Sequence, residues 1–574
     1  MRFARVSLMC GLLLLLGASI VTADTEPLQE KSWLWVGSHY TDFTDSPKKV
    51  GEYNLGNDEF LPELGFYRFE RHADRWYNVW AYYYDDQNIW GRIKAKTSDK
   101  LSLDIKYSSL VRQTEQDLLE NMNAREYFPT TGTLGGKQLT HELKDAGADY
   151  HYNRQELLTK LDLLLARDHN VHLQAAHRSI VMKGHEQKIA NSHCFSCHLV
   201  SDGARVNRET HSVEVGVQGD VNEMTLGYQF GYRKFASDAG DYLATYDEVR
   251  HPADPNPVTA AEFQSRQVFG DEALPAGVLP ETEKMSHKLR LKGKVGQGQL
   301  ASALAYSKTT NQNVDLSTTG IQGYVNYSLP VNPKTRLVAR VDAKKITADD
   351  PDVDLPTFRD GKAGPQTDFD FTRYSSLDRS EAKATVEVTR RMSPRFTLAG
   401  MLGYHMVNRD DYPFEGDGTH SGTFIGQAKA NYRKGLKYST RLKYRFEKTS
   451  DPFMSGRGLF ESPMHDALQS GFKFIFYSAR EDFRYQNITT APTDQHELEW
   501  QSTWRPDKKL GVNLGLKFRY DKNGDLDSLD VKHTTMQPFA NLTLTPSPKW
   551  SLTAGFRYDQ YKSRGPVTVA LFDG

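Results

Sequence analysis

The sequence predicts an all-β fold, a large transmembrane antiparallel β-barrel of about 20–26 strands. Three observations support this prediction. Many segments alternate between apolar and polar residues, short turns alternate with long polar connections, and the composition is polar yet rich in aromatic residues and glycine.

The composition suits a barrel better than a helical membrane protein. The chain has 574 residues, with 29 Tyr, 28 Phe and 43 Gly but only 3 Cys. Charged residues make up 25% of the chain, and the mean hydropathy is -0.62. Such polarity excludes a bundle of membrane helices, whereas a barrel needs apolar residues only at alternate positions of each strand. The formal net charge of -1 argues against nucleic acid as a partner.

Residues 1–23 are expected to be a cleaved signal peptide. Two arginines precede an apolar run from Val6 to Ile20, and Val21-Thr22-Ala23 supplies a small-residue cleavage site. An uncleaved membrane anchor is the alternative, but the run is short for a spanning helix of about 20 residues. Cys10 lies inside the signal peptide, so two cysteines are expected in the mature chain, residues 24–574. We therefore expect export and insertion into the cell outer membrane.

Strands are expected where apolar and polar residues alternate over about ten residues, the length that crosses a bilayer at a tilt. The pattern is clearest in the second half of the chain. The expected strands include Trp76–Tyr84, Met224–Arg233, Ile321–Leu329, Thr335–Ile346, Ala382–Thr389, Phe396–His405, Phe424–Tyr432, Tyr438–Phe446, Gly471–Tyr477, Val512–Tyr520 and Leu552–Tyr558.

The connections between these strands are of two kinds. Short turns are expected at Asn332-Pro333, Ser393-Pro394, Arg433-Lys434-Gly435, Pro506-Asp507 and Ser547-Pro548. Long polar connections are expected at Ala348–Ser380, Val407–Thr419, Thr449–Met464 and Asp521–Lys532. Alternation of short turns with long loops is typical of an outer-membrane barrel.

The strands are expected to have one lipid-facing and one lumen-facing side. In Thr440–Phe446, the side chains of Leu442, Tyr444 and Phe446 would face lipid, and those of Arg441, Lys443 and Arg445 would face a wet lumen. A soluble all-β protein such as a propeller is the alternative, but no motif repeats at a fixed period. At the end of the chain, Pro566 to Phe572 is expected to be a strand, followed by Asp573 and Gly574.

One motif carries chemistry. Cys194-Phe195-Ser196-Cys197-His198 has the C-x-x-C-H pattern of covalent haem attachment. Two thiols at this spacing can add to the two vinyl groups of one haem, and the adjacent histidine becomes the proximal iron ligand. A redox disulfide is the alternative, but it would call for a thioredoxin-like βαβ context that the sequence lacks. We predict one haem c bound by Cys194, Cys197 and His198, in a haem-binding segment, residues 178–212.

The sequence does not identify the sixth iron ligand. His193 precedes the motif directly and is poorly placed to reach round the iron. A second histidine would give a low-potential haem suited to electron transfer, whereas an open position would suit small-molecule chemistry. We favour His177 or His185 among the nearby candidates His169, His172, His177, His185 and His211.

The combination of signal peptide, aromatic-rich barrel and Cys-x-x-Cys element resembles the MtrB/PioB family of decahaem-associated outer-membrane porins and the related porins of porin–cytochrome conduits. The cysteine pair lies farther from the N-terminus than in MtrB, and here it is followed by the histidine that haem needs. The motif-like residues are Cys194–His198, Ser201-Asp202-Gly203-Ala204-Arg205, Val213–Val217 and Tyr232-Arg233-Lys234-Phe235.

The resemblance implies a sheath that holds periplasmic and surface multihaem c-type cytochromes in contact, so that electrons cross the outer membrane. The chain would then be an electron-transfer porin rather than an enzyme, with multihaem cytochromes and outer-membrane lipid as partners. One haem cannot span about 30 Å of hydrocarbon, so partner haems must complete the path. Two other hypotheses are a transport porin in which Cys194 and Cys197 form a structural disulfide, and a haem enzyme or sensor with an open coordination position.

Overall fold

The computed structural model describes the strands of the chain and many of the turns that join them. The described residues are 29–42, 52–53, 59–119, 142–193, 198–245, 273–353, 358–359, 366–367, 371–373, 377–409, 419–452, 460–461, 491–524 and 531–565. The predicted signal peptide and the predicted strands Gly471–Tyr477 and Pro566–Phe572 lie outside them.

A single antiparallel sheet of 23 strands dominates the structure, and the secondary structure of the described residues is entirely β. The predicted all-β class and strand number are therefore confirmed. The long strands, in chain order, are β1 (Gln29–Thr41), β2 (Glu59–His72), β3 (Arg75–Tyr83), β4 (Ile89–Thr97), β5 (Leu101–Gln113), β7 (His151–Ala166), β8 (Val171–His193), β9 (His198–Val221), β10 (Met224–Ser237), β13 (Thr282–Val295), β14 (Gly298–Asn311), β15 (Leu316–Asn332), β16 (Thr335–Ala348), β21 (Arg379–Ser393), β22 (Phe396–Asn408), β23 (His420–Lys434), β24 (Tyr438–Ser450), β26 (Asp494–Trp504), β27 (Leu510–Lys522), β28 (Lys532–Ser547), β29 (Trp550–Arg557) and β30 (Gln560–Arg564).

Short strands complete the fold. One of them, β6 (Glu142–Leu143), joins the main sheet through the sole parallel pairing among the described residues, with β9. The others form separate small sheets: β11 (Leu243–Thr245) with β12 (Ala273–Pro275), β17 (Asp352–Val353) with β20 (Phe371–Arg373) and β25 (Phe460–Glu461), and β18 (Phe358–Arg359) with β19 (Gln366–Thr367).

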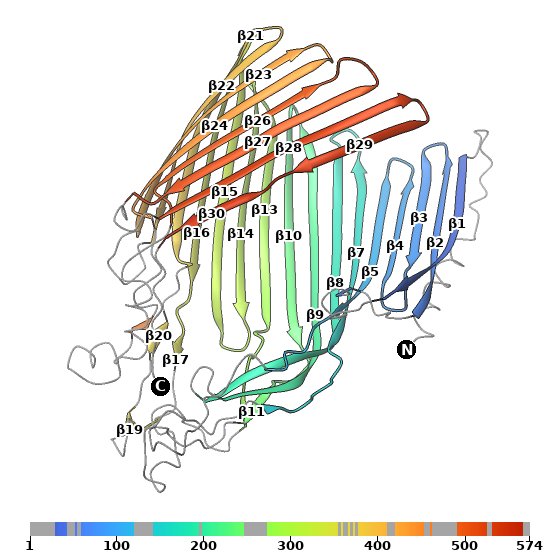
Figure 1. The fold of residues 1–574 in the computed structure, drawn as a ribbon, viewed down its shortest axis with the longest axis vertical. Helices are drawn as coiled ribbons and strands as arrows, with labels where there is room; N and C mark the ends of the chain where they lie inside the picture. The colour runs from blue at the N-terminus through green and yellow to red at the C-terminus, as the bar shows by residue number, and fades with distance from the viewer. Residues whose placement is uncertain are drawn as a thin grey trace.

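Each long strand up to β28 pairs with the next long strand in the chain, and β29 and β30 pair in succession with β28. The main sheet is therefore an up-and-down meander (Figure 1). The predicted short turns are found between β15 and β16, β21 and β22, β23 and β24, β26 and β27, and β28 and β29. These turns all lie at one end of the sheet, which we call the short-turn end. The predicted long connections lie at the opposite end, which we call the long-loop end.

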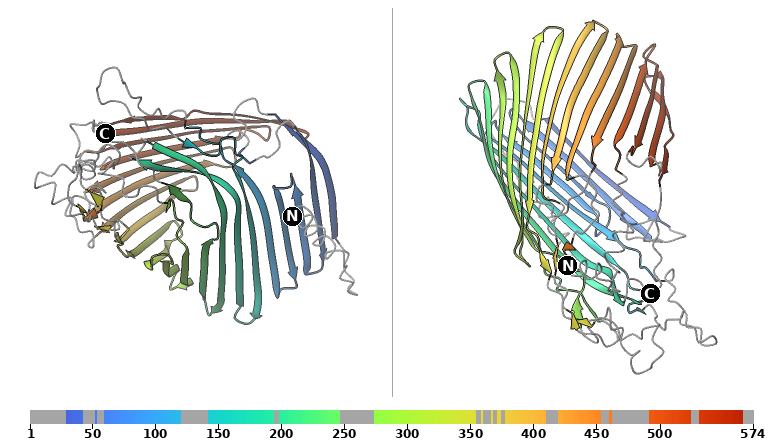
Figure 2. Two further views of the ribbon diagram at one scale, coloured as in Figure 1. Left: turned by 90° about the horizontal axis from the view of Figure 1, so that it is seen from below. Right: turned by 90° about the vertical axis from the view of Figure 1, so that its left-hand side faces the viewer.

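The sheet curls round on itself, with β1 and the pair β29–β30 at its two edges (Figure 2). Both edges run from the short-turn end to the long-loop end, because neighbouring long strands alternate in direction throughout the meander. Closure by antiparallel pairing would therefore require one further strand between these edges. None of the described residues forms a long apolar helix capable of crossing a lipid bilayer.

The two faces of the main sheet differ in chemistry, because successive side chains of a strand point to opposite sides. On β22, Leu402 is 63% exposed, whereas its neighbour Met401 is half-buried on the other face. We call the face that carries Leu402 the apolar face and the opposite one the polar face. The apolar face carries many exposed side chains of Leu, Val, Ile, Met and aromatic residues.

The polar face is crowded with ion pairs. Nζ of Lys443 lies 2.9 Å from Glu497 and 3.3 Å from Glu499, and Nζ of Lys517 lies 3.2 Å from Glu497. The Lys443 side chain is only 15% exposed, as expected on the concave side of a curled sheet. The prediction that Leu442 and Lys443 lie on opposite faces of the sheet is confirmed, since Leu442 is exposed on the apolar face.

Candidate haem-attachment hairpin

The predicted haem motif falls in the sequence between β8 and β9, the longest paired strands among the described residues, and of the motif only the backbone of His198 is described. Strands β8 and β9 have 23 and 24 residues, and no other strand exceeds 17. Their pairing continues from His172 and Gln218 to His193 and His198. The hairpin belongs to the long-loop end of the sheet, because the turn that precedes β8 and the turn that follows β9 lie at the short-turn end.

The outer part of this hairpin extends beyond the rest of the sheet. The pairing of β8 with β7 ends at Gly184, and that of β9 with β10 ends at Arg208. Residues 185–193 and 198–207 therefore pair with each other beyond the rest of the sheet, joined only by the two-residue strand β6, and we call this ribbon the arm. In Figure 1 the arm bends away from the sheet at its lower end.

A glycine allows β8 to lie very close to β7 at the point where the arm leaves the sheet. Gly184 has a φ of 154° and pairs with Tyr152, the second residue of β7. A Cβ atom at Gly184 would lie 2.2 Å from the carbonyl oxygen of His151 and 2.5 Å from the Cα of Tyr152. A side chain at this position would force β7 and β8 apart.

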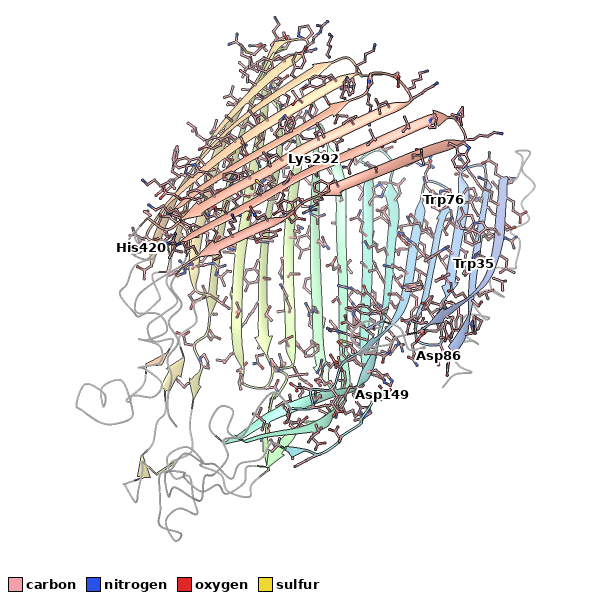
Figure 3. The ribbon with its side chains drawn as sticks, viewed as in Figure 1. Trp35, Trp76, Asp86, Asp149, Lys292 and His420 are labelled. Atoms are coloured by element: carbon pink, nitrogen blue, oxygen red, sulfur yellow. The ribbon has the colours of Figure 1, made fainter. Side chains whose placement is uncertain are left out.

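A small packed core, which we call the base of the arm, supports β9 from Val200 to Val206. Buried side chains are scarce in the main sheet, but several gather here; Val200, Ser201, Val206 and Tyr150 are each at most 2% exposed. Strand β6 pairs with Val200 and Ser201, and the backbone N–H of Lys144 donates to the carbonyl oxygen of Ser201 at 2.9 Å. In Figure 3, Asp149 marks where the preceding segment passes the base of the arm. This core holds β9 only a few residues beyond the predicted haem motif.

Polar side chains fasten the arm to the segment that follows β5. The amide of Gln187 donates to the Ser201 hydroxyl oxygen at 2.7 Å and to the carbonyl oxygen of Asp117 at 2.8 Å. The backbone N–H of Asp117 donates to Oε1 of Gln187 at 2.7 Å. Each such bond contributes about 1 kcal/mol.

Tyr150 closes the core with a buried phenol. Its hydroxyl donates to the carboxylate of Asp145, and its carbonyl oxygen accepts from the backbone N–H of Thr114 at 2.9 Å. Burial, together with the bond to Asp145, raises the pKa of Tyr150 above its usual value. The neutral phenol is therefore the form that stabilises the base of the arm.

The predicted haem ligands are only partly within the described residues. Cys194 and Cys197 lie outside them. The backbone of His198 begins β9 and pairs with His193 across the hairpin. The predicted haem-binding segment, residues 178–212, coincides with the outer part of the β8–β9 hairpin, since Arg178 pairs with Ser212.

The structure does not bring His177 or His185 to the tip of the hairpin. His177 lies in the main sheet, where its ring stacks on that of His211 at 6.1 Å. His177 precedes His193 by 16 positions and His185 precedes it by eight, which are contour lengths of about 53 and 26 Å. In this paired arrangement neither ring lies beside His193 or His198. The assignment of His177 or His185 as a distal ligand stays a prediction.

The other candidate histidines lie in the sheet or in one of its turns, and two of them contact carboxylates. Nδ1 of His172 lies 2.5 Å from Asp162, and His211 contacts Glu209 at 3.6 Å. His169 precedes β8 in the turn at the short-turn end. Among the residues that the structure describes, no three His, Cys, Asp or Glu side chains converge as they would to hold a metal ion.

No family model and no curated protein matches the chain. Solved structures resemble it weakly. The FrpB iron transporter from Neisseria meningitidis (F3-3 variant) shares 10% identity at a TM-score of 0.47, over 88% of this chain and 77% of that one. The siderophore receptor PiuA from Acinetobacter baumannii shares 9% at 0.40, over 95% and 80%. The ferric citrate transporter FecA shares 8% at 0.42, over 93% and 71%. None of these likenesses is close enough to assign a function.

Proposed function

We propose that the chain is an outer-membrane β-barrel that carries one haem c at the tip of the arm and transfers electrons with multihaem c-type cytochromes. The observation that carries the proposal is the position of the C-x-x-C-H motif. It joins two paired strands at the end of an anchored ribbon that projects from the sheet. A projecting tip is open to the attachment machinery and to a partner protein.

The apolar face supports the membrane part of the proposal. Soluble proteins rarely expose apolar patches larger than a few hundred Å². Here exposed apolar side chains recur on strand after strand of the same face; examples are Val215 on β9, Leu289 on β13, Leu304 on β14, Val386 on β21 and Leu402 on β22. Lipid is the solvent that suits such a surface.

Aromatic rings border this surface at two levels. Near the short-turn end, Tyr438 of β24 pairs with Trp504 of β26. Near the long-loop end, the ring of His496 packs between those of Phe446 and Tyr520, at 5.3 and 6.4 Å. Tyr438 and Phe446 are eight residues apart, which is about 26 Å along the strand. A strand tilted by about 45° needs about 9–11 residues to cross the membrane, and aromatic girdles flank the apolar band of an outer-membrane barrel at both interfaces. The spacing of the two levels is slightly shorter than one such crossing.

The arrangement of turns supports an assignment of the two ends. Outer-membrane barrels have short periplasmic turns and long external loops. By this rule the arm projects on the outer side of the membrane, and a haem at its tip would meet a surface cytochrome directly. The path from the periplasm would run through haems of a partner, because one haem cannot cross about 30 Å of hydrocarbon.

The residues of the chain would bind and position the haem, and the haem itself would supply the redox chemistry. Cys194 and Cys197 would attach the ring and His198 would bind the iron, which supplies one-electron chemistry when bound. The packed base of the arm would fix the position of the tip relative to the barrel. The sixth ligand would come from a group outside the β8 segment that holds His177 and His185.

Mass spectrometry of the mature protein purified from membranes tests the proposal. We expect the polypeptide mass plus that of one haem, and a haem-stained band on a denaturing gel. The double variant Cys194→Ser/Cys197→Ser should lose both, whereas Ser196→Ala, which keeps the C-x-x-C-H spacing, should retain both. A wild-type mass without haem would reject the redox function and favour a transport porin.

Two further measurements separate electron transfer from haem chemistry. Six-coordinate low-spin iron in the visible spectrum would favour electron transfer, whereas five-coordinate iron would favour an enzyme or sensor. Copurification of a multihaem cytochrome with the wild-type chain would support the conduit, and its absence at every stage of a gentle detergent extraction would count against it.

A further inference from the structure

One part of the polar face, formed by four neighbouring strands, differs in charge from the rest. Strands β10, β13, β14 and β15 are neighbours in the main sheet. Their pairing registers place six cationic side chains and no carboxylate on the polar face between them; these are Arg233, Lys284, Lys288, Arg290, Lys292 and Lys294. We call this surface the basic wall. Five of the six belong to alternate positions of β13, and Figure 3 labels one of them, Lys292.

Small side chains flank the row of cations on β13. On β14, Ala301, Ala303 and Ala305 stand opposite Lys292, Arg290 and Lys288. On β10, Gly227 and Gly231 stand opposite Arg290 and Ser286. The cationic side chains therefore stand above a row of alanines on the β14 side, and Arg290 also stands beside a glycine on the β10 side. A solute can approach them over these small residues.

The basic wall lacks the counter-ions found elsewhere on the polar face. Lys443 and Lys517 share Glu497 and Glu499, and Lys429 pairs with Glu387 at 3.0 Å. Within the described part of the chain, by contrast, no carboxylate lies within salt-bridge distance of Lys284, Lys288, Arg290 or Lys292. Arg290 donates to the side-chain oxygen of Gln229 at 3.3 Å, and Lys294 contacts Glu223 of the neighbouring turn at 3.4 Å.

The absence of counter-ions has an electrostatic consequence. Alternate residues of a strand are about 6.6 Å apart, which is less than the screening length of about 8 Å at physiological ionic strength. The cations of β13 therefore repel one another along the strand. A bound anion would remove this repulsion, and one that carries several charges would contact neighbouring cations together.

A hollow gives such an anion room. A pocket of about 450 Å³ on the polar face is lined by Lys288, Arg290 and Gly227, and it extends towards β5 and β7. The lining also holds Lys160 and three carboxylates. Asp104 pairs with Arg92 at 2.6 Å and Asp162 lies 2.5 Å from His172, whereas Glu214 accepts a hydrogen bond from the neutral amide of Gln229 at 2.6 Å. An anion is therefore expected on the Lys288 and Arg290 side of the hollow.

We propose that the basic wall is a binding site for small, multiply charged oxyanions inside the barrel. The ligand class is set by the row of cations, the low flanks and the volume of the hollow. The site is distinct from the haem hairpin, and its Lys and Arg residues are not part of the haem ligand set. It would attract polyanionic solutes to one side of the lumen.

Calorimetric titration of the full-length protein in non-ionic detergent tests the site, with inorganic tripolyphosphate as the probe at low ionic strength. We expect saturable binding that weakens steeply as NaCl is added. The variant Lys288→Gln/Arg290→Gln/Lys292→Gln should bind at least tenfold more weakly. The control Lys334→Gln/Lys437→Gln/Lys508→Gln makes the same change in net charge at exposed turns of the short-turn end, and should bind as the wild type does.

Each outcome decides the proposal. No binding to the wild type at low ionic strength, or equal weakening in the two triple variants, would overturn it. If the first triple variant fails to fold, Arg290→Gln alone should still weaken binding relative to Lys437→Gln. The measurement is made on protein with or without haem, so a negative result here leaves the haem proposal standing, and loss of haem leaves this result intact.

Discussion

Gly184 lies so close to β7 that a Cβ atom at its position would be 2.2 Å from the carbonyl oxygen of His151. This contact is the point at which the arm leaves the sheet, because the pairing of β7 with β8 ends there. The orientation of the predicted haem tip therefore depends on a position where only a hydrogen atom fits.

The variant Gly184→Val should loosen the arm. Displacement of backbone atoms and the positive φ together should cost about 1–3 kcal/mol, and the arm should become more sensitive to limited proteolysis. Gly400→Ala is the control, because nothing lies within 4 Å of a Cβ atom at Gly400. Equal rates of cleavage of the arm in the two variants would show that the contact with β7 is unimportant.

Lysine substitutions at two adjacent positions of β22 should differ in their effect on the stability of the barrel. Leu402→Lys places a charge on the apolar face and should destabilise the membrane-inserted barrel by about 2–4 kcal/mol. Met401→Lys places the same charge on the polar face, opposite Glu387, and should be tolerated. Urea unfolding in lipid vesicles measures both. A soluble sheet would accept Leu402→Lys readily, since Leu402 is already 63% exposed.

The base of the arm should weaken at alkaline pH. The folded-state pKa of Tyr150 is raised by burial and by its bond to Asp145. Its contribution to stability is therefore complete below the unfolded pKa of about 10 and is lost as the pH rises through the higher folded pKa. Proteolysis of the arm should accelerate above about pH 10 in the wild type. Tyr150→Phe should show a faster basal rate with a smaller pH dependence, and identical pH profiles would contradict this role.

Single cysteines should reveal which side of the membrane the arm occupies. Arg205→Cys lies at an exposed position of the arm, and Lys334→Cys lies at an exposed turn of the short-turn end. A membrane-impermeant maleimide should label Arg205→Cys in intact cells and should label Lys334→Cys only after the outer membrane is permeabilised. The reverse pattern would place the haem hairpin on the periplasmic side.

Removal of His177 or His185 should leave the iron unchanged. In the described pairing both histidines lie well along β8 from His193, and we therefore expect neither to bind a haem at the motif. His177→Phe and His185→Phe should therefore retain the visible and electron paramagnetic resonance spectra of the wild type. Conversion of the iron to a high-spin form in either variant would mean that the arm folds differently when haem is attached.

The sequence alone was sufficient for the fold class and for most strand positions in the second half of the chain. Predicted strands such as Thr335–Ile346 and Phe396–His405 lie within β16 and β22, because period-two alternation directly reflects the two faces of a sheet. The opposition of Leu442 to Lys443 follows for the same reason. The basic residues of β13 can also be seen in the sequence, where Lys284, Lys288, Arg290, Lys292 and Lys294 occupy alternate positions interrupted by Ser286. Whether they form an anion site depends on which strands flank β13.

Only the tertiary structure decided how distant segments meet. Sequence spacing placed His177 and His185 near the motif, but an extended strand rises about 3.3 Å per residue, so residues near in sequence can be far apart in space. The support of the arm arises from segments far apart in the chain, with Tyr150 and Asp117 packing or bonding near Ser201 and Gln187. Local patterning determines which way each side chain points, whereas register and long-range pairing determine its neighbours.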